Sequence, residues 1–337
     1  MQICFKQKNK GLEIKIKILI TGASGFIGEM LVRELSEHEL VLMQRNGRRQ
    51  DKGKNKIFIH DLSKECSFAE AMEGVDAVIH AAALVHQLDK SSEPCYEQYV
   101  TVNVNATEAL ARAAISAGVK HFIFFSTIKV LGEVSRAGSP LRWNSPFRPS
   151  NAYSVSKMEA ERCLGRLSST SNMRVSIIRP PLVYGPGVKA NFRRLLNLSR
   201  QTPLFPYNEN FGRRSMVSVW NLVDFVRTLI VRQPNSSDVY MISDDSDCNA
   251  YELLRFMADA QNSKLYGLKI PLWALNFAFS VIGKSDYFQK IFGELRVDMT
   301  HTSVITGWKP IHKTEDGINV LLNHKASEDR RKNTLPG

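Results

Sequence analysis

The chain has 337 residues, 43% of them hydrophobic, which is enough for one large or two medium domains with a full core. Its net charge of +12 fits plain solubility or attraction for an anionic ligand such as a nucleotide. Nucleic-acid binding is disfavoured, because no compact block of Lys and Arg with interleaved aromatic residues is present. The five scattered cysteines include no CxxC pair, so we expect no metal, no disulfide framework and a cytoplasmic location.

The apolar segments are too short for a membrane span. The start of the chain is basic but lacks a long apolar core, which argues against a signal peptide. The most apolar later window, residues 270–282, is shorter than the ~20 residues that a span needs. We expect a helix there that is buried or faces a partner, with peripheral membrane contact left open.

The first strong motif is TGASGFIG at residues 21–28, which follows an apolar strand pattern at 16–20 and precedes a helical pattern. A strand, a glycine turn and a helix in this order are typical of dinucleotide binding. Gly22 would permit the tight turn, Gly25 would let a pyrophosphate approach, and Gly28 would let the helix pack on the strand. The predicted cofactor contacts also include Ser24, Phe26 and Ile27. The alternative is a plain Gly/Ser turn.

A second strand is predicted at 40–43, followed by Gln44, Arg45 and Asn46. At this place a dinucleotide fold carries an acid that binds the 2′-hydroxyl of NAD, or an arginine that accommodates the 2′-phosphate of NADP. Because no acid is present and Arg48 and Arg49 follow, we expect NADP(H) to be favoured, with NAD(H) possible. The alternative is a basic surface loop.

Two further segments are predicted to line the cofactor. Asp61 and Leu62 follow a strand at 56–60, and Asp61 could bind the adenine amino group or cap the next helix. A strand at 76–80 runs into three alanines, Ala81, Ala82 and Ala83. Small residues there favour close approach of the cofactor, with plain close packing as the alternative.

Strand and helix patterns alternate regularly to about residue 180 and become irregular after Pro180 and Pro181. This predicts an α/β fold of Rossmann type, a doubly wound parallel sheet with a smaller C-terminal substrate-binding lobe. The expected divisions are a basic tail at 1–14, an NAD(P)-binding domain at 15–180, a lobe at 181–322 with segments returning to the first domain, and a mobile tail at 323–337.

The later units carry the predicted chemistry. A helix at 99–117 contains Asn103, and a strand at 121–126 brings Ser126 and Thr127 to the carboxyl edge, where open α/β sheets bind ligands.

Tyr153 and Lys157 lie one turn apart in a helix predicted at 152–167. A nearby ammonium lowers the pKa of a phenol, which otherwise lies near 10. Tyr153 would then exchange a proton, and Thr127 would bind the substrate hydroxyl or carbonyl, while hydride moves to or from a nicotinamide. Tyr-x-x-x-Lys alone is common in helices. Its position after the glycine turn and a Ser-Thr strand end makes it informative.

As a set, these motifs resemble the extended short-chain dehydrogenase/reductases, the NAD-dependent epimerase/dehydratase family acting on nucleotide sugars. The resemblance covers about residues 15–322. It rests on TGASGFIG at 21–28, Asp61-Leu62, HAAA at 80–83, Asn103, Ser126-Thr127, YSVSK at 153–157, RPPLVYGPG at 179–187 and Gly307-Trp308. It implies catalytic roles for Thr127, Tyr153 and Lys157. The implied cofactor contacts extend to Asn103, Tyr153, Lys157 and Pro180.

The resemblance also implies substrate contacts and an assembly. Asn191 and Arg214 would contact the nucleotide diphosphate, and Ser126 would contact the substrate. His86 would line the sugar pocket, although a surface or packing role fits it equally. A homodimer would pair the helices near 97–117 and 152–167. Leu131 stands where many epimerases carry a tyrosine, so it is not expected to be catalytic.

A finer resemblance comes from FSTIKVLGE at 125–133 and RPPLVYGPGVKANFRRLL at 179–196. These look like bacterial surface-polysaccharide enzymes that reduce a UDP-4-keto-6-deoxy-N-acetylhexosamine, so we expect NADPH-dependent reduction of a 4-keto group. A UDP-glucose or UDP-N-acetylglucosamine 4-epimerase is the alternative. The missing acid at 44–46 favours the reductase, because an epimerase retains NAD whereas a reductase exchanges its cofactor. A non-catalytic NADP-sensing protein is a third hypothesis, which intact Tyr153 and Lys157 count against.

Overall fold

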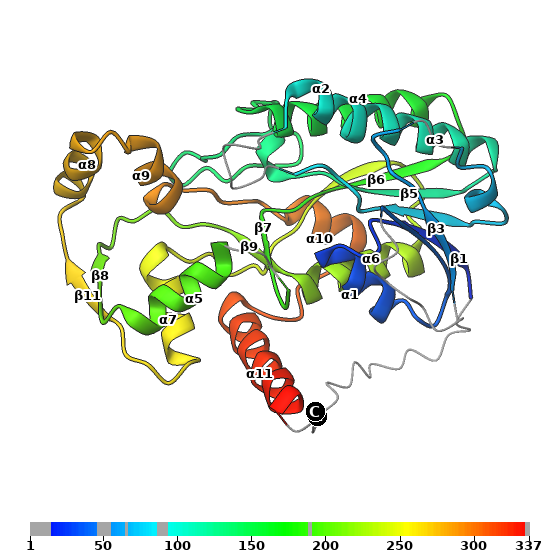
Figure 1. Ribbon diagram of the computed structural model, residues 1–337. Helices are drawn as coiled ribbons and strands as arrows, with labels where there is room; N and C mark the ends of the chain where they lie inside the picture. The colour runs from blue at the N-terminus through cyan, green and yellow to red at the C-terminus, as the bar shows by residue number, and fades with distance from the viewer. Residues whose placement is uncertain (1–14, 46–54, 65–66, 86–93, 188–190, 334–337) are drawn as a thin grey trace.

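A seven-stranded parallel sheet forms the centre of the protein (Figure 1). The computed structural model describes residues 15–45, 55–64, 67–85, 94–187 and 191–333. The strands in spatial order are β3 (Lys56–Ile59), β2 (Glu39–Gln44), β1 (Lys17–Thr21), β4 (Ala77–His80), β5 (His121–Phe125), β6 (Arg174–Arg179) and β10 (Asp238–Met241). The predicted doubly wound parallel sheet is confirmed.

Helices cover both faces of this sheet (Figure 1). One face carries α2 (Tyr96–Tyr99), the π-helical turn η3 (Val100–Asn105), α3 (Ala106–Ser116) and α4 (Ala152–Ser169). The other carries α1 (Phe26–Glu34), α6 (Val219–Arg232) and α10 (Thr300–Thr306). Two 3-10 turns are η1 (Glu70–Met72) and η4 (Ile128–Val130). Because α6, α10 and β10 come from the second half, that half completes both the sheet and its lower layer.

The central strands are apolar along their whole length because they are buried on both faces. In β1, Ile18 and Ile20 belong to the core cluster that includes α1 and α6, whereas Leu19 belongs to the cluster that includes α3 and α4. This two-sided burial explains the continuous apolar runs in the sequence.

The order of the sheet reverses between β1 and β4. The chain passes from β1 outward to β2 and β3, and then returns to β4 on the other side of β1. Thr21 and His80 are register partners at the carboxyl ends of β1 and β4. The glycine turn therefore lies at the topological switch point, where open α/β sheets bind ligands.

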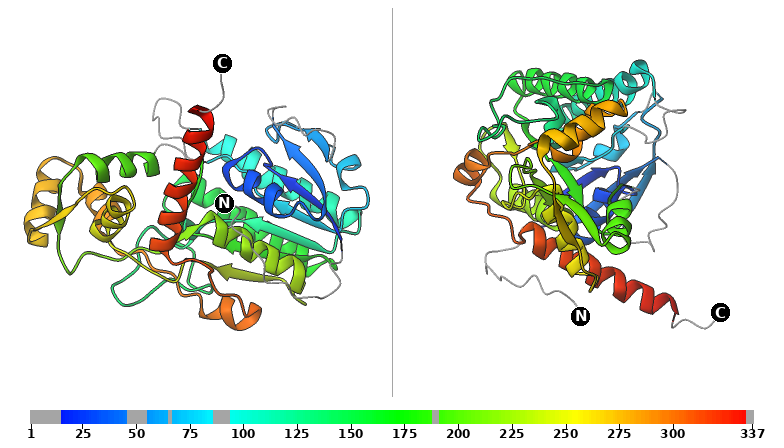
Figure 2. Two further views of the ribbon diagram at one scale, coloured as in Figure 1. Left: turned by 90° about the horizontal axis from the view of Figure 1, so that it is seen from below. Right: turned by 90° about the vertical axis from the view of Figure 1, so that its left-hand side faces the viewer.

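The rest of the second half forms a smaller lobe at one end of the sheet (Figure 2). It contains two small parallel pairs, β7 (Leu182–Tyr184) with β9 (Met216–Ser218) and β8 (Leu204–Tyr207) with β11 (Tyr266–Lys269). Its helices are α5 (Asn191–Gln201), α7 (Ala250–Asp259), α8 (Leu272–Val281), α9 (Ser285–Phe292) and α11 (Thr314–Asn333). The backbone is thus helical across most of the segment expected to be a tail.

The helix expected at 270–282 forms as α8, but most of its side chains are not buried. Its one buried side chain is Leu275, and Trp273 and Phe277 are largely exposed. Within the described residues, no helix is both long and apolar enough to cross a membrane.

Candidate active site

Close backbone contacts shape the glycine turn between β1 and α1. Gly22 has a φ of +68°, and a Cβ there would stand 2.8 Å from the Ala82 nitrogen. At Gly28, a Cβ would stand 2.1 Å from the Gly22 carbonyl oxygen. At Gly25, the exposed N-cap of α1, a Cβ would meet only that same oxygen, at 3.1 Å. Gly22 and Gly28 allow close packing. Gly25 leaves room at a helix N-terminus that fits a pyrophosphate.

A buried hydrogen-bond chain connects this turn to the helix layer. His80 Nδ1 lies 2.6 Å from Thr21 Oγ1, and His80 Nε2 lies 2.8 Å from Thr107 Oγ1. The Thr107 hydroxyl donates to the Asn103 carbonyl oxygen. Burial lowers the pKa of His80 to about 3, with Lys157 adding to the effect, so the imidazole is neutral. His80 therefore supports the site as a neutral bridge.

Asn103 joins the loop after β4 to α4. It lies in η3, and π-helical turns are frequent at functional sites. Its Oδ1 accepts from the Leu84 N–H at 2.8 Å, and its Nδ2 donates to the Leu84 carbonyl and to Ser156 Oγ, both at 3.0 Å. The amide thus holds in place the loop that contains Ala81, Ala82 and Ala83, which are half-buried.

Thr127 and Lys157 lie at the carboxyl end of β5, and Tyr153 lies in the same helix as Lys157. Thr127 caps η4 just beyond this strand, and its side chain accepts from the Lys129 N–H. Lys157 is buried in α4, and its Nζ donates to the Phe125 carbonyl oxygen at 2.7 Å. Tyr153 is half-buried one turn earlier, with its ring 6.2 Å from that of Tyr99.

The protonation of this pair differs from our expectation. Burial raises the pKa of Tyr153 to about 12, and Tyr99 adds to the rise. Burial lowers the pKa of Lys157 to about 7, against the opposing effect of Glu161. Desolvation outweighs the expected effect of an ammonium on the phenol, because Lys157 is itself desolvated and donates to the strand end. The Tyr153 phenol is therefore protonated at neutral pH.

The Ser126 hydroxyl is hydrogen-bonded within the protein. Its hydroxyl donates to Glu161, and the Glu161 carboxylate is held by Arg179 Nη2 at 2.6 Å and Arg179 Nε at 3.0 Å. The side chains of Glu161 and Arg179 are 3% and 4% exposed. This buried ion pair fixes α4 against the ends of β5 and β6, where Pro180 accepts from the Ile128 N–H at 2.9 Å.

The predicted adenine-side residues lie at the other side of the switch point. Arg45 is exposed just after β2. Asp61 accepts from the Ser63 N–H and hydroxyl, which together with nearby Arg45 and Lys64 hold the pKa of the carboxyl below its usual range. Asp61 therefore closes a local turn next to a basic side chain and caps no helix, since the next helical turn of the described residues, η1, begins at Glu70. Leu62 packs on the core.

Three further residues of the turn are predicted to contact the cofactor. Ser24 and Ile27 are half-buried, and Ile27 packs on the core. The Phe26 ring lies under the turn at 185–187, where a Cβ on Gly185 would stand 3.3 Å from it. The turn that follows β7 thus rests on α1.

Arg214 lies in the lobe, between β8 and β9. Its Nη1 donates to the Gly293 carbonyl oxygen at 3.1 Å, and its backbone bridges to Cys248 and Leu295. Burial lowers the pKa of its guanidinium, opposed by Glu133. Asn191 is the first residue of α5, and only its backbone is described. His86, Arg48 and Arg49 lie outside the described residues.

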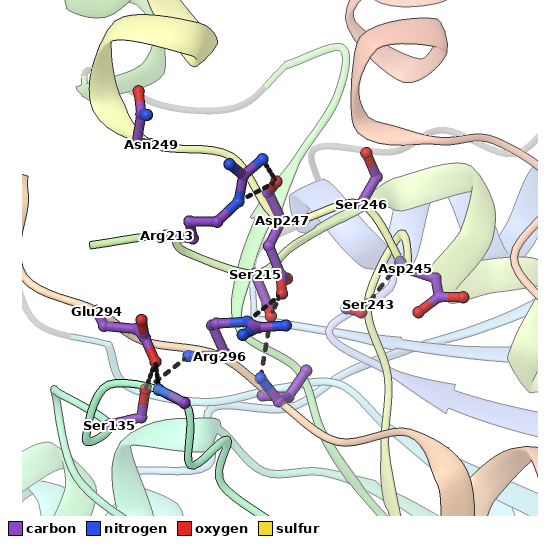
Figure 3. Close-up of polar contacts among 12 residues, drawn as sticks. Ser135, Arg213, Ser215, Ser243, Asp245, Ser246, Asp247, Asn249, Glu294 and Arg296 are labelled. Carbon is purple, nitrogen blue, oxygen red and sulfur yellow. Dashed lines mark hydrogen bonds and ion pairs between the residues drawn. The ribbon is translucent and has the colours of Figure 1, made fainter. Parts of the chain in front are cut away.

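Polar contacts beside Arg214 tie its segment to the lobe (Figure 3). Arg213 Nη2 donates to the Asp247 carbonyl oxygen at 2.6 Å. The Asp247 carboxylate accepts from Arg296 Nε at 2.7 Å and from Ser215 Oγ at 2.5 Å. The backbone N–H of Arg296 donates to Ser135 Oγ, from the loop after β5. The Arg214 segment is thereby connected to the sheet edge that carries Thr127.

Sequence reasoning missed three features of this region. Tyr99 beside Tyr153 gave no local signal. Glu161 follows Lys157 by four residues, a helical spacing that could have indicated its position. Asp244 accepts from the Tyr184 hydroxyl at 2.6 Å and Asn221 Nδ2 at 2.6 Å, contacts between segments far apart in the chain.

Residues 18–242 match the profile of the NAD dependent epimerase/dehydratase family. This chain belongs to that family. It is accordingly an enzyme of the epimerase/dehydratase type, and the resemblance inferred from the motifs is confirmed.

Two curated relatives illustrate the similarity. A UDP-glucose 4-epimerase of Vibrio cholerae is 38% identical over 307 residues, which cover 89% of this chain and 93% of the relative. An N-acetyl-alpha-D-glucosaminyl-diphospho-ditrans,octacis-undecaprenol 4-epimerase of Escherichia coli O157:H7 is 27% identical, with 75% of each chain covered.

Solved structures share the fold. MoeE5 in complex with UDP-glucuronic acid and NAD superposes with a TM-score of 0.73 at 21% identity, covering 93% of this chain and 99% of that one. A UDP-glucuronic acid 4-epimerase from Bacillus cereus in complex with NAD gives 0.72 at 18% identity, with the same coverage. At these identities the likeness concerns the fold alone.

Proposed function

We propose that this enzyme catalyses oxidoreduction at C4 of a UDP-linked sugar. The observation that supports the proposal is that Thr127 directly follows β5 and that α4, with Tyr153 and Lys157 one turn apart, is held to this strand end by the hydrogen bond from Lys157 Nζ to the Phe125 carbonyl. The names of the relatives support a UDP-sugar as substrate, since several act on or bind one. Arg214 in the lobe supplies a cation suited to a diphosphate.

The residues present fit a dinucleotide. Gly22, Gly25 and Gly28 would hold the pyrophosphate at the start of α1, with Ala81, Ala82 and Ala83 beside it. When bound, the nicotinamide supplies or accepts the hydride. We infer a preference for NADP(H), because Arg45 follows β2 and no acid is present at 44–46.

The net reaction we propose is reduction of the 4-keto group of a UDP-4-keto-6-deoxy-N-acetylhexosamine, a step in surface-polysaccharide biosynthesis. Tyr153 is protonated, because burial raises its pKa, and it donates its proton to the sugar O4. The Thr127 hydroxyl binds the same oxygen. Lys157 would bind the nicotinamide ribose, and its positive charge would stabilise the Tyr153 phenolate that forms when the proton leaves.

Epimerisation at C4 is a second candidate. It is supported by the name of the relative that is 38% identical, and it uses the same three residues. An epimerase must first take a proton through Tyr153 and later return it, so it retains its cofactor between the two half-reactions. A reductase delivers hydride once and releases the oxidised cofactor.

The deciding experiment follows the cofactor. We expect stoichiometric loss of NADPH absorbance with a UDP-4-keto-6-deoxy-N-acetylhexosamine and no conversion of UDP-glucose or UDP-N-acetylglucosamine to the galacto epimer. Purified protein that carries NAD⁺, interconverts those epimers without added cofactor and ignores the keto sugar would establish the epimerase instead.

A charge-reversal pair tests the cofactor preference separately. Arg45→Glu should weaken NADPH binding roughly tenfold or more, because a charge-assisted contact to phosphate is lost. The control Lys120→Glu makes the same charge change in an exposed residue just before β5, at the amino-terminal ends of the strands, whereas Arg45 lies at their carboxyl ends. Fluorescence titration with NADPH and NADH measures both.

The homodimer stays a prediction, which light scattering checks.

A further inference from the structure

Helix α8 carries several strongly exposed apolar side chains. Trp273, Phe277 and Val281 are 74%, 66% and 69% exposed, and their spacing of four residues places them along one side of the helix. Two further exposed apolar side chains follow soon after this helix in the chain: Ile282 and Tyr287. We call these five residues the α8 patch.

A small aromatic core holds this patch in a defined shape. Leu275 of α8 packs with Phe288 and Phe292 of α9 and with Phe211. The Phe211 and Phe292 rings lie 4.5 Å apart, and the Phe288 and Phe292 rings 5.3 Å apart. The inner side chains are therefore packed within the lobe, and α8 and α9 lie at the end of the lobe that is far from the sheet (Figure 1). Single exposed apolar residues are ordinary, but a contiguous set on a supported helix marks an interaction surface.

The charges around the patch are mainly positive. Residues 264–291 include Lys264, Lys269, Lys284 and Lys290, and the one acid among them is Asp286. Lys269 and Lys290 also make exposed ion pairs with Glu209 and Glu133, at 3.6 and 3.9 Å. Such exposed pairs are weak, so they compete poorly with a dense array of anions.

We propose that the α8 patch docks this enzyme on an anionic membrane surface. Helix α8 is too short to span a bilayer, but it carries no charge, and Trp and Tyr prefer the headgroup region. The apolar side chains enter the interface while the lysines contact anionic headgroups. A second copy of the chain would present the same positive charge, which disfavours self-association through this face.

Docking in this way would orient the lobe. Gly212 and Phe292 are joined by a backbone hydrogen bond, and Arg214 donates to Gly293 at the end of α9. The patch is therefore connected to the segment that carries Arg214 through α9, since Phe292 also packs with Leu275 of α8. The proposal concerns where the enzyme works and does not depend on whether it reduces or epimerises its substrate.

Vesicle flotation with the full chain tests this proposal. We expect binding to phosphatidylcholine vesicles that contain phosphatidylglycerol, and weak binding to phosphatidylcholine alone. The double variant Trp273→Ser/Phe277→Ser should bind roughly a hundredfold or more weakly, because two large apolar side chains no longer enter the interface. The matched control Val304→Ser/Ile305→Ser removes two exposed apolar residues from α10 and should bind like the wild type.

A charge variant and a mass measurement complete the test. Lys269→Glu/Lys284→Glu keeps the apolar face and should lose the preference for anionic vesicles. Wild-type protein that stays unbound with every vesicle, or binds neutral and anionic vesicles equally, overturns the proposal. So does a dimer, measured by sedimentation velocity, that the Trp273/Phe277 double variant abolishes while vesicle binding is unchanged.

Discussion

The two halves of the chain stabilise their buried polar groups differently. In the first half, polar groups are paired along the sheet edge: His80 bridges two threonines, and Glu161 pairs with Arg179. In the second half, Asp244 gathers donors from several segments, including Tyr184, Ser218 and Thr314. The sheet places the site residues of the first half through its backbone. The lobe relies on carboxylates that accept from several segments, Asp244 here and Asp247 beside Arg214.

The largest expected effect is on turnover, and it comes from a substitution in the first half. Tyr153→Phe keeps the ring but removes the transferable proton, so turnover should fall roughly 10²–10⁴-fold, the usual contribution of general acid–base catalysis. Cofactor binding should be retained, as measured by fluorescence titration. The control Tyr96→Phe removes an exposed hydroxyl that donates to Glu159 of α4, and it should leave turnover nearly unchanged. Wild-type turnover in Tyr153→Phe would exclude this residue as the acid.

Breaking the buried ion pair sharpens the comparison. Glu161→Gln leaves the Arg179 cation buried without its carboxylate, so the free energy of unfolding should fall by about 3–5 kcal/mol. The exposed pair of Arg112 with Glu108 is the control, and Glu108→Gln should change stability by only ~0.3–0.5 kcal/mol. Chemical denaturation measures both. Equal effects in the two variants would contradict a special role for the buried pair.

The buried Asp244 carboxyl of the second half predicts that the free energy of unfolding depends on pH. Burial raises the pKa of Asp244 from 3.8 to about 6, against the lowering effect of its donors. The folded carboxyl keeps its proton where the unfolded one loses it, so the folded state binds more protons between these values. The free energy of unfolding should therefore fall as pH rises through this window, by on the order of 3 kcal/mol. The loss is complete above pH 6, where the buried carboxyl is ionised.

The comparison of wild type with Asp244→Asn isolates this contribution. The variant cannot titrate, so the difference in unfolding free energy between wild type and variant should change with pH from about 4 to 6 and stay constant outside that range. A constant difference across the whole range would show that the pKa of Asp244 is the same in the folded and unfolded protein, and would contradict the raised pKa.

A glycine pair gives the smallest effect. Gly28→Ala places a Cβ against the Gly22 carbonyl and should destabilise the protein by about 1–3 kcal/mol and weaken cofactor binding. Gly165 lies inside α4, and a Cβ there meets nothing within 4 Å. Gly165→Ala should therefore stabilise the protein by about 0.5–1 kcal/mol. Thermal unfolding with and without NADPH measures both, and destabilisation by both alanines would contradict the packing argument.

The sequence predicted what depends on local pattern. The apolar runs located the central strands to within about two residues, and the Tyr153–Lys157 spacing indicated one helix. It did not predict that Ser126 donates to Glu161, since that contact joins a strand end to a helix through a side chain. Nor did it predict the contacts of Asp244, whose partners come from segments with no shared periodicity. For α8, apolar composition suggested burial or a partner, and only the packing of Leu275 shows which side faces outward.

The return of β10 to the sheet has a consequence for biosynthesis. Residues Asp238–Met241 pair with Ser176–Arg179 of β6, so the sheet lacks its seventh strand until the lobe segments before it have left the ribosome. A nascent chain that ends near residue 180 presents β6 as an unpaired edge, which is a template for association with other chains. We therefore expect the first half expressed alone to aggregate, although it contains the whole glycine turn and the Tyr153–Lys157 pair.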